Sequence, residues 1–232
     1  MPLRPRQHAF TLVELSIVLV VIGLIVGGLL LGRDLIENGE RKQIMKEVDS
    51  IRMAVNAFRI KYNYYPGDMP NASTLFSPCI AWCNGNADGK IQPSTEMYAA
   101  WFFLGASGLY PGTYSGAYNF VGLTSYTWGL NAPPAKRGGG YAFTWPYSPN
   151  LMAEYTYSIH YTSAFNTSTG YDIPTVTPAF AREIDKKFDD GYPEQGRITA
   201  TRGSDTTVTC RLSSIAYDIT NSNVGCVMFF NY

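Results

Sequence analysis

Histidine is scarce in this chain, and neither sign of charge is in excess. Two of the 232 residues are histidine, and 18 Lys and Arg residues balance 18 Asp and Glu residues. A triad hydrolase needs a nucleophile with an imidazole base, and only His160 could supply one after the first apolar segment. The balanced charge indicates no basic surface for nucleic acid. The scarcity of histidine therefore argues against a triad enzyme, and the balanced charge argues against a nucleic-acid-binding surface.

Cysteine is also sparse, with four occurrences that all follow residue 78. An even number of cysteines at short separations suits two local bridges in an oxidising compartment. We therefore favour the disulfides Cys79–Cys83 and Cys210–Cys226, although four cysteines allow three connectivities. The alternative is a metal cluster, for which this part of the chain offers no CxxC pair and only His160 as an imidazole.

One long apolar run, from Phe10 to Leu31, contains a single carboxylate at Glu14. About twenty apolar residues cross a bilayer as a helix of roughly 30 Å. An ionisable group inside such a span costs about 2.5 to 3.5 kcal/mol even on lenient insertion scales. Glu14 therefore needs a compensating partner, unless the segment is a plain single-pass anchor that carries a stray acid.

The residues before this run are few and basic, with Arg4 and Arg6 followed by the small residue Ala9 directly before Phe10. A secretory signal has its small-residue cleavage site after the apolar region, and that region is shorter. Here the order is reversed. A cleavage after Ala9 would therefore leave the membrane helix in the mature protein.

The basic leader, the small residue and the segment Phe10-Thr11-Leu12-Val13-Glu14-Leu15 closely resemble the N-terminus of type IV pilins and type II secretion pseudopilins. The resemblance implies a prepilin peptidase that cuts between Ala9 and Phe10 and methylates the new amine. It also implies that Glu14 meets the N-terminal amine of a neighbouring subunit during assembly. A carboxylate within a membrane needs such a cationic partner. The family usually has Gly before the cut, where this chain has Ala9.

Four glycines in and directly after the apolar run form two small-xxx-small pairs, Gly23 with Gly27 and Gly28 with Gly32. This spacing lets helices approach closely in a membrane. The same glycines weaken a helix by about 1 kcal/mol each relative to alanine. Close packing between subunits and local unwinding are both open uses, and Gly is common in membrane helices in general.

Helical periodicity continues past the apolar run as one stripe of an amphipathic helix. The stripe consists of Ile44, Val48, Ile51, Val55, Phe58 and Tyr62. Pro66 and Gly67 forbid continuation of the helix. The expected organisation is a leader at 1–9, a membrane and filament-core helix at 10–32, its amphipathic continuation at 33–65 and an extracytoplasmic globular domain at 66–232. The resemblance implies a pilin-like α+β fold, in which the long helix packs on an antiparallel β-sheet.

Residues 84–91 carry oxygen-bearing side chains at alternate positions, followed by Gly89. This pattern is the first half of a calcium loop of the D-x-[DN]-x-[DN]-G kind. The candidate ligands are the side chains of Asn84, Asn86 and Asp88 and the carbonyl of Lys90. The first ligand is Asn instead of Asp, and the closing acid, Glu96, falls one place later than in an EF-hand. A turn-rich loop closed by Cys79–Cys83 explains the pattern without a metal. No cofactor is required, and calcium is the cofactor that the pattern suggests.

A short helix is expected from Glu96 to Leu104, capped by Ser94 or Thr95 and ended by Gly105. Residues 105–150 are rich in Gly, Tyr, Ser and Pro and carry only two charges. Their rings could present aromatic faces to a glycan or another protein, or could pack internally. We favour internal packing. Strand character returns at 141–145 and 155–161, which places His160 on a sheet face.

A second helix is expected from Thr177 and Pro178 to Phe188, followed by the paired acids Asp189 and Asp190. Acids at a helix C-terminus oppose the helix dipole, so they need basic neighbours, a cation, a neighbouring subunit or a solvated turn. Strand-like segments at 206–210 and 226–230 close the chain and would be joined by the second disulfide. Segments 62–68 and 184–196 resemble recurrent segments of pseudopilin-like proteins.

These features predict a filament subunit, minor or specialised, of a type IV pilus-like or type II secretion pseudopilus system. Its expected partners are other pilin or pseudopilin subunits, the prepilin peptidase and the inner-membrane assembly machinery. The expected location is the bacterial inner membrane as a single-pass protein with a periplasmic C-terminal domain, and then a periplasmic or surface filament. The alternative is a membrane-anchored surface adhesin or a glycan- or protein-binding module.

Overall fold

The computed structural model describes residues 11–79, 83–92, 95–116, 126–144, 155–166, 171–203 and 208–232. Ala9 and Phe10 lie outside the described residues, and so does Ser94. The chain divides into two compact units, Met1–Lys42 and Gln43–Tyr232, and the boundary falls within the first helix.

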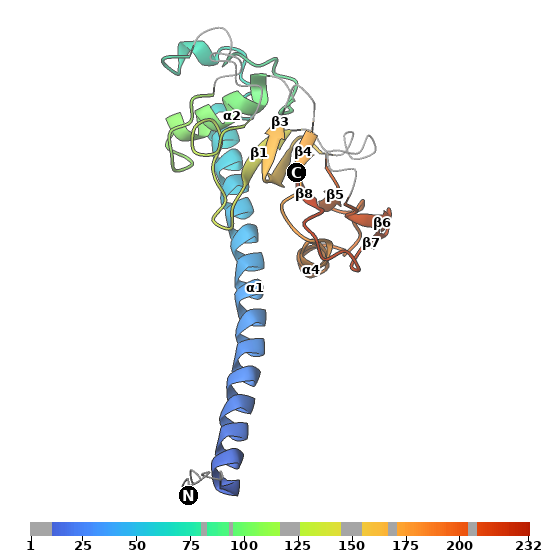
Figure 1. Ribbon diagram of the computed structural model, residues 1–232. Helices are drawn as coiled ribbons and strands as arrows, with labels where there is room; N and C mark the ends of the chain where they lie inside the picture. Colours follow the sequence, from blue (N-terminus) through green and yellow to red (C-terminus); the bar gives the residue numbers. More distant parts are fainter. Residues whose placement is uncertain are drawn as a thin grey trace, which may run out of the picture. The chain divides into compact units, whose positions relative to one another are not determined.

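Helix α1 spans Leu12–Tyr62 and is 51 residues long (Figure 1). It ends three residues before the boundary that Pro66 and Gly67 suggest. Asn63 has a φ of 62° and takes the left-handed conformation, which Asn tolerates better than most residues. Its N–H still donates to the carbonyl of Arg59 at 2.8 Å, as is common just after a helix. The end of the helix is therefore set by Asn63.

The amphipathic stripe of α1 lies in the core of the second unit, as predicted. The side chains of Val48, Ile51, Val55 and Phe58 are fully buried, and Ile44 is 1% exposed. The ring of Phe58 lies 6.0 Å from that of Phe103 on helix α2, Thr95–Ala106. Burial of a stripe of this kind, and not intrinsic propensity, accounts for most helix stability in proteins.

The sheet of the second unit has four antiparallel strands in the order β1-β2-β8-β5 within the described residues. Their bounds are Gly140–Thr144 for β1, Ser158–Thr162 for β2, Val227–Asn231 for β8 and Ile198–Thr201 for β5. All residues of these strands are buried, so both faces of the sheet are covered. The last strand of the chain thus lies between β2 and β5. The α+β arrangement of a long helix followed by an antiparallel sheet is confirmed.

Strand β2 begins later than the alternation of 155–161 predicts. The N–H groups of Thr156 and Tyr157 both donate to the carbonyl of Tyr232, at 2.6 and 3.0 Å, so this stretch bends around the last residue before the strand starts. Strand β1 is shifted by one residue from the predicted 141–145, and Trp145 lies outside the described residues. Strand β5 carries the sequence ITAT, and the sequence reasoning missed it.

The predicted strand at 206–210 does not form in the described part, where Thr209 and Cys210 precede a short hairpin. This hairpin pairs β6, Arg211–Ser213, with β7, Ala216–Tyr217. Residues 204–207 lie outside the described residues. A further two-stranded sheet pairs β3, Ala164–Asn166, with β4, Tyr171–Ile173.

Helix α2 continues past Gly105, where the sequence predicts its end, and stops at Ala106. Gly108 follows with a φ of 71°, so the residue that takes the left-handed conformation is this later glycine. A short 3-10 turn, η1, covers Ala72–Thr74. Helix α4 spans Pro178–Phe188 as predicted, and the hydroxyl of Thr177 caps it by accepting from the N–H of Phe180 at 3.3 Å.

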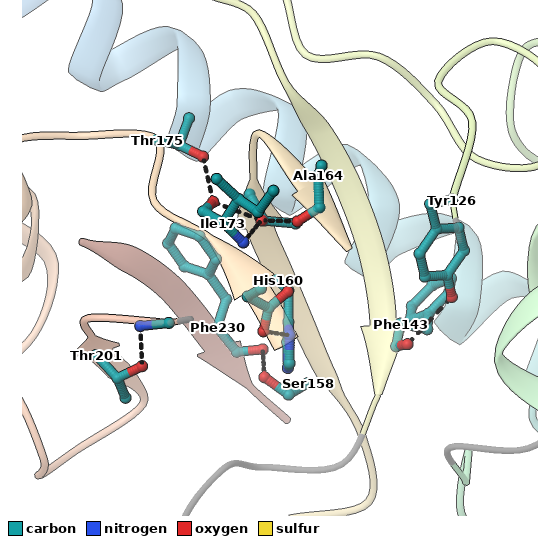
Figure 2. Close-up of polar contacts among 12 residues, drawn as sticks. Tyr126, Phe143, Ser158, His160, Ala164, Ile173, Thr175, Thr201 and Phe230 are labelled. Atoms are coloured by element: carbon teal, nitrogen blue, oxygen red, sulfur yellow. Dashed lines mark hydrogen bonds and ion pairs between the residues drawn. The ribbon is translucent and has the colours of Figure 1, made fainter. Parts of the chain in front are cut away.

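Two disulfides link the pairs that the spacing favours. Cys79 pairs with Cys83 and Cys210 with Cys226, with Cα separations of 6.0 and 4.9 Å. Within the described part of the 105–150 segment, Tyr114, Tyr126 and Phe143 are buried. Tyr126 donates to the carbonyl of Phe143 at 3.2 Å (Figure 2). These rings pack internally, as expected.

Candidate functional site: the N-terminal assembly segment

The described part of the N-terminal segment starts with a capping box at Thr11 and Glu14. The Glu14 carboxylate accepts from the Thr11 N–H and from the Thr11 hydroxyl, both at 2.8 Å. In return, the Thr11 hydroxyl oxygen accepts from the Glu14 N–H at 3.2 Å. This reciprocal pair satisfies N–H groups that the first turn of a helix leaves without partners. Sequence reasoning missed Thr11, although the T-x-x-E spacing before an apolar run is the known signal.

The capping box gives Glu14 a local partner in the isolated chain. Both of its contacts with Thr11 use the same oxygen, Oε2, and Glu14 is exposed. The first turn also carries the positive end of the helix dipole, which favours a negative group there. The carboxylate is therefore held at the start of α1 with one oxygen engaged. It can accept hydrogen bonds from a cation brought to it by another chain.

The apolar half of α1 exposes side chains on all sides. Leu12, Leu19 and Leu24 are 85%, 70% and 72% exposed, and none of the most apolar window is buried inside the chain. By length and composition, α1 is the helix of the described residues that can cross a membrane. A helix that is apolar all round requires lipid or other helices around it.

The four glycines of the two small-xxx-small pairs lie on this exposed surface. A Cβ added at Gly23, Gly27, Gly28 or Gly32 would meet nothing within 4 Å. The glycines are thus not explained by packing within the described part of the chain. The helix remains continuous through all of them, so the isolated chain shows no unwinding there. A close approach by a second helix remains a use for this surface.

Comparison with known families identifies this segment. The family described as the prokaryotic N-terminal methylation motif matches residues 4–30. The chain carries the type IV pilin and pseudopilin signature. The match covers the leader, the predicted cleavage site at Ala9 and Phe10, and the apolar helix with Glu14. No curated protein and no solved structure matches the chain. The signature therefore identifies the N-terminal segment, and the second unit must be interpreted from its own geometry.

The predicted calcium loop lies around two buried carboxylates of the second unit. Asp68, which the sequence reasoning missed, accepts from the N–H groups of Asp88 and Gly89 at 3.0 and 2.9 Å. Glu96 accepts from the N–H groups of Asn86 and Gln92 at 3.3 and 2.9 Å. Asp68 and Glu96 are 1% and 4% exposed. The loop is thus folded onto acids from outside it.

The candidate ligand oxygens of this loop already accept hydrogen bonds. The Asn84 side chain accepts from the N–H of Ser73 at 2.9 Å, and that of Asn86 from the N–H of Asp88 at 3.0 Å. Asp88 accepts from the N–H of Lys90 at 3.0 Å. These are the local turns that Asn and Asp form without a metal. Calcium binding by Asn84, Asn86, Asp88, Lys90 and Glu96 stays a prediction.

Burial is the main cause that raises the pKa of Asp68 and that of Glu96. The charge of Asp88 raises the pKa of Asp68 further, and the charges of Asp68 and Asp88 raise the pKa of Glu96. The backbone N–H groups that they accept from act in the opposite direction. A cation would relieve this repulsion, and so would a proton.

Three acids at the end of α4 form a second carboxylate cluster. One oxygen from each of Asp185, Asp189 and Asp190 lies within 4.8 Å of the others. The buried Asp185 accepts from the Tyr217 hydroxyl at 2.6 Å and from the N–H of Gly191 at 3.0 Å. Asp189 accepts from the N–H of Ile198 at 2.8 Å. Asp185 thus ties α4 to β7, and Asp189, one of the two paired acids, ties the end of α4 to β5.

Burial is the main cause that raises the pKa of Asp185, to about 7 from its ordinary value of 3.8. The hydrogen bonds from Tyr217 and Gly191 lower it, and the charges of Asp190 and Asp189 raise it further. A pKa of about 7 places the change of charge of Asp185 near neutral pH.

His160 lies on β2, as predicted, but inside the core. Its side chain is nearly buried, and its Nδ1 lies 2.9 Å from a carboxylate oxygen of Asp172 on β4 (Figure 2). Its ring also contacts Phe229 of β8, with centroids 4.1 Å apart. An imidazole held in this way joins two sheets instead of facing a substrate cleft. It does not provide an accessible general base.

Proposed function

We propose that this protein is a minor or specialised subunit of a type IV pilus-like or type II secretion pseudopilus filament. The observation that carries the proposal is the methylation motif at 4–30 running into a helix whose apolar surface the chain leaves uncovered. Filament cores of parallel helices and lipid bilayers both supply the apolar surroundings that such a helix needs. The role is polymerisation, and no bond chemistry is assigned to the second unit.

The proposed assembly step joins Glu14 to the α-amino group of Phe10 on a neighbouring subunit. Prepilin peptidase creates that amine by cutting after Ala9. In the isolated chain, Glu14 is engaged by Thr11 through one oxygen. A bond to an ammonium group joins two opposite charges, so it is stronger than these bonds from uncharged donors, and more so in a medium of low dielectric constant. The amine of the neighbouring subunit therefore binds the free acceptor positions of the Glu14 carboxylate, which the capping box holds in place.

The proposed location follows from the same segment. The protein is stored in the bacterial inner membrane through α1, with the second unit in the periplasm, and it then moves into a filament. Two disulfides in the second unit fit an oxidising compartment. The large second unit, Gln43–Tyr232, favours a minor or specialised subunit over a repetitive major one.

Mass spectrometry of the membrane-extracted protein tests the processing step. In cells with an active prepilin peptidase, we expect the chain to begin at methylated Phe10. Cells that lack the peptidase are the control and should contain the full chain from Met1. An unprocessed Met1 start in both strains contradicts the proposal. The variant Ala9→Gly restores the residue that the family usually has at this position, and should be cut at the same bond at an equal or higher rate.

A further inference from the structure

A cavity of about 270 Å³ opens in the second unit beside the second half of α1. It is bounded by α1, by the bend that precedes β2, by the start of β5 and by the last residue of the chain. Its lining includes four tyrosines and two arginines: Tyr65, Tyr155, Tyr157, Tyr232, Arg52 and Arg197. None of these residues belongs to the assembly segment, and the proposed filament role does not use them.

Three of these tyrosines, Tyr65, Tyr157 and Tyr232, pack against one another and form one wall of the cavity, the tyrosine wall. Tyr157 is 2% exposed and Tyr65 is 9% exposed. The ring of Tyr157 lies 5.8 Å from that of Tyr65 and 5.6 Å from that of Tyr232. The carbonyl of Tyr232 accepts from the N–H groups of Thr156 and Tyr157, which holds the end of the chain in this position. Burial raises the pKa of Tyr157 and of Tyr232, so their hydroxyls stay neutral and can donate hydrogen bonds.

The two arginines place positive charge at the edge of this wall. The guanidinium of Arg52 lies over the Tyr232 ring, 5.4 Å from its centroid, and pairs with Asp49 at 3.3 Å. Arg197 is exposed, and its carbonyl accepts from the N–H of Asn231 at 2.8 Å, which fixes its backbone beside β8. Among the described residues, no carboxylate lies within ion-pair distance of the Arg197 guanidinium. Arg197 therefore brings to the cavity a positive charge that is not ion-paired within the described part of the chain.

We propose that this cavity binds an acidic sugar, with its carboxylate at the arginines and its ring against the tyrosines. A guanidinium binds a carboxylate through two parallel hydrogen bonds. Tyrosine rings offer flat apolar faces that suit the C–H face of a pyranose, and neutral hydroxyls that suit its polar edge. Asn56 lies one helical turn after Arg52 and also lines the cavity, where its amide can bond to sugar hydroxyls.

The size of the cavity limits the ligand. Sites for drug-sized ligands occupy about 300 to 1,000 Å³, so 270 Å³ suits a single sugar ring. A free anion would use the arginines and leave the tyrosine wall unused. A neutral sugar would use the tyrosine wall and leave Arg197 without an ion-pair partner. An acidic monosaccharide uses both features.

The test is a binding titration of the full-length chain in detergent, followed by ligand-observed NMR. The probes are glucuronate, glucose, acetate and inorganic phosphate at constant ionic strength. We expect glucuronate to bind at least tenfold more tightly than each of the other three. Equal binding of glucuronate and glucose would overturn the role of the arginines. Equal binding of glucuronate and acetate or phosphate would show a simple anion site and overturn the proposal.

Two variants and a matched control locate the site. Arg197→Gln should weaken glucuronate binding at least tenfold, and Arg52→Gln should weaken it to a smaller degree because Asp49 already offsets part of its charge. Arg202→Gln removes an exposed arginine just after β5 that does not line the cavity, and it should leave binding unchanged. Circular dichroism checks that each variant is folded. Equal affinities for Arg197→Gln and Arg202→Gln would place the ligand elsewhere and overturn the proposal.

Discussion

The two halves of α1 are continuous in sequence and in helical structure, yet their apolar side chains are covered in different ways. In the first unit, apolar side chains such as Leu19 and Leu24 are exposed on every side. In the second unit, the apolar residues form one stripe, and Val48 and Phe58 are fully buried by the chain itself. The apolar face of the second half is covered within the folded chain, whereas that of the first half must be covered by lipid or by another chain.

Because of this difference, the two halves should contribute to different properties, one to the stability of the second unit and the other to assembly. Side chains of the stripe contribute to the folding of the second unit, because their burial occurs in every isolated molecule. Side chains of the first unit contribute only when lipid or another subunit covers them. Substitutions in the two halves should therefore have separable effects.

The largest expected effect is on the stability of the second unit. Phe58→Ala removes a fully buried ring at the α1–α2 contact and should lower the free energy of unfolding by about 3 to 5 kcal/mol. The matched control is Leu19→Ala in the exposed half, which should change it by less than about 0.5 kcal/mol. Urea unfolding of the full chain in detergent, followed by tyrosine and tryptophan fluorescence, measures both. Similar losses of unfolding free energy in the two variants would show that both halves of α1 contribute to the stability of the folded chain.

Filament incorporation should show the opposite pattern. Glu14→Ala removes the carboxylate that the proposed assembly step requires, and should lower the amount of subunit in sheared filaments at least tenfold. Membrane insertion, cleavage and the unfolding midpoint of the second unit should stay unchanged. Glu37→Ala is the control, because Glu37 is an acid of the same helix whose contacts are with Arg33 and Arg41. Normal incorporation of Glu14→Ala would make this residue a local cap only.

A smaller effect should depend on pH and arise only in the second unit. The pKa of Asp185 is raised to about 7 in the folded chain from its ordinary 3.8, so the folded state binds the proton more tightly than the unfolded state. Its contribution to stability is therefore fully present below about pH 4 and is lost as the pH rises towards about 7. Asp68 and Glu96 act in the same direction.

The isosteric variant Asp185→Asn isolates this contribution. It should unfold a few degrees higher than the parent at pH 8, since about 1 to 2 kcal/mol corresponds to roughly 2 to 8 °C for a unit of this size. At pH 4 the two melting temperatures should agree. Glu183→Gln is the control, because Glu183 is an exposed acid of the same helix that is not among the groups that shift the pKa of Asp185, and its substitution should leave the pH profile nearly unchanged. If the melting temperature of Asp185→Asn depends on pH in the same way as that of the parent, the pH dependence arises from other acids.

Local patterns in the sequence were enough for several elements. The stripe from Ile44 to Phe58 reads directly as a helix face, and Thr177 with Pro178 marks the start of α4. Each of these signals lies within a few residues of the structure that it specifies. The late start of β2 was missed because the carbonyl of Tyr232, far along the chain, bends residues 156 and 157. The short strand β5 was missed as well, and its ladder is formed with β8 near the end of the chain.

The candidate sites also differ in whether a local pattern or a distant contact specifies them. The N-terminal signature was readable because the leader, the predicted cleavage site and Glu14 lie within one short segment. The role of Asp68 in the 83–92 loop was not, since the acid precedes the groups that it binds by about twenty residues. A Cβ at Gly85 would overlap the backbone of Asp68, so the loop packs directly on it. Nothing in the local pattern of either segment predicts that contact.

By itself, the sequence determined the assembly segment, because a linear motif and an apolar run act through their own residues and need no tertiary fold. The tertiary structure decided the insertion of β8 between β2 and β5, the burial of His160 against Asp172, and the cavity at Arg197 and Tyr157. These features join residues that are far apart along the chain. Their formation depends on the total free energy of packing the second unit, which no single segment specifies.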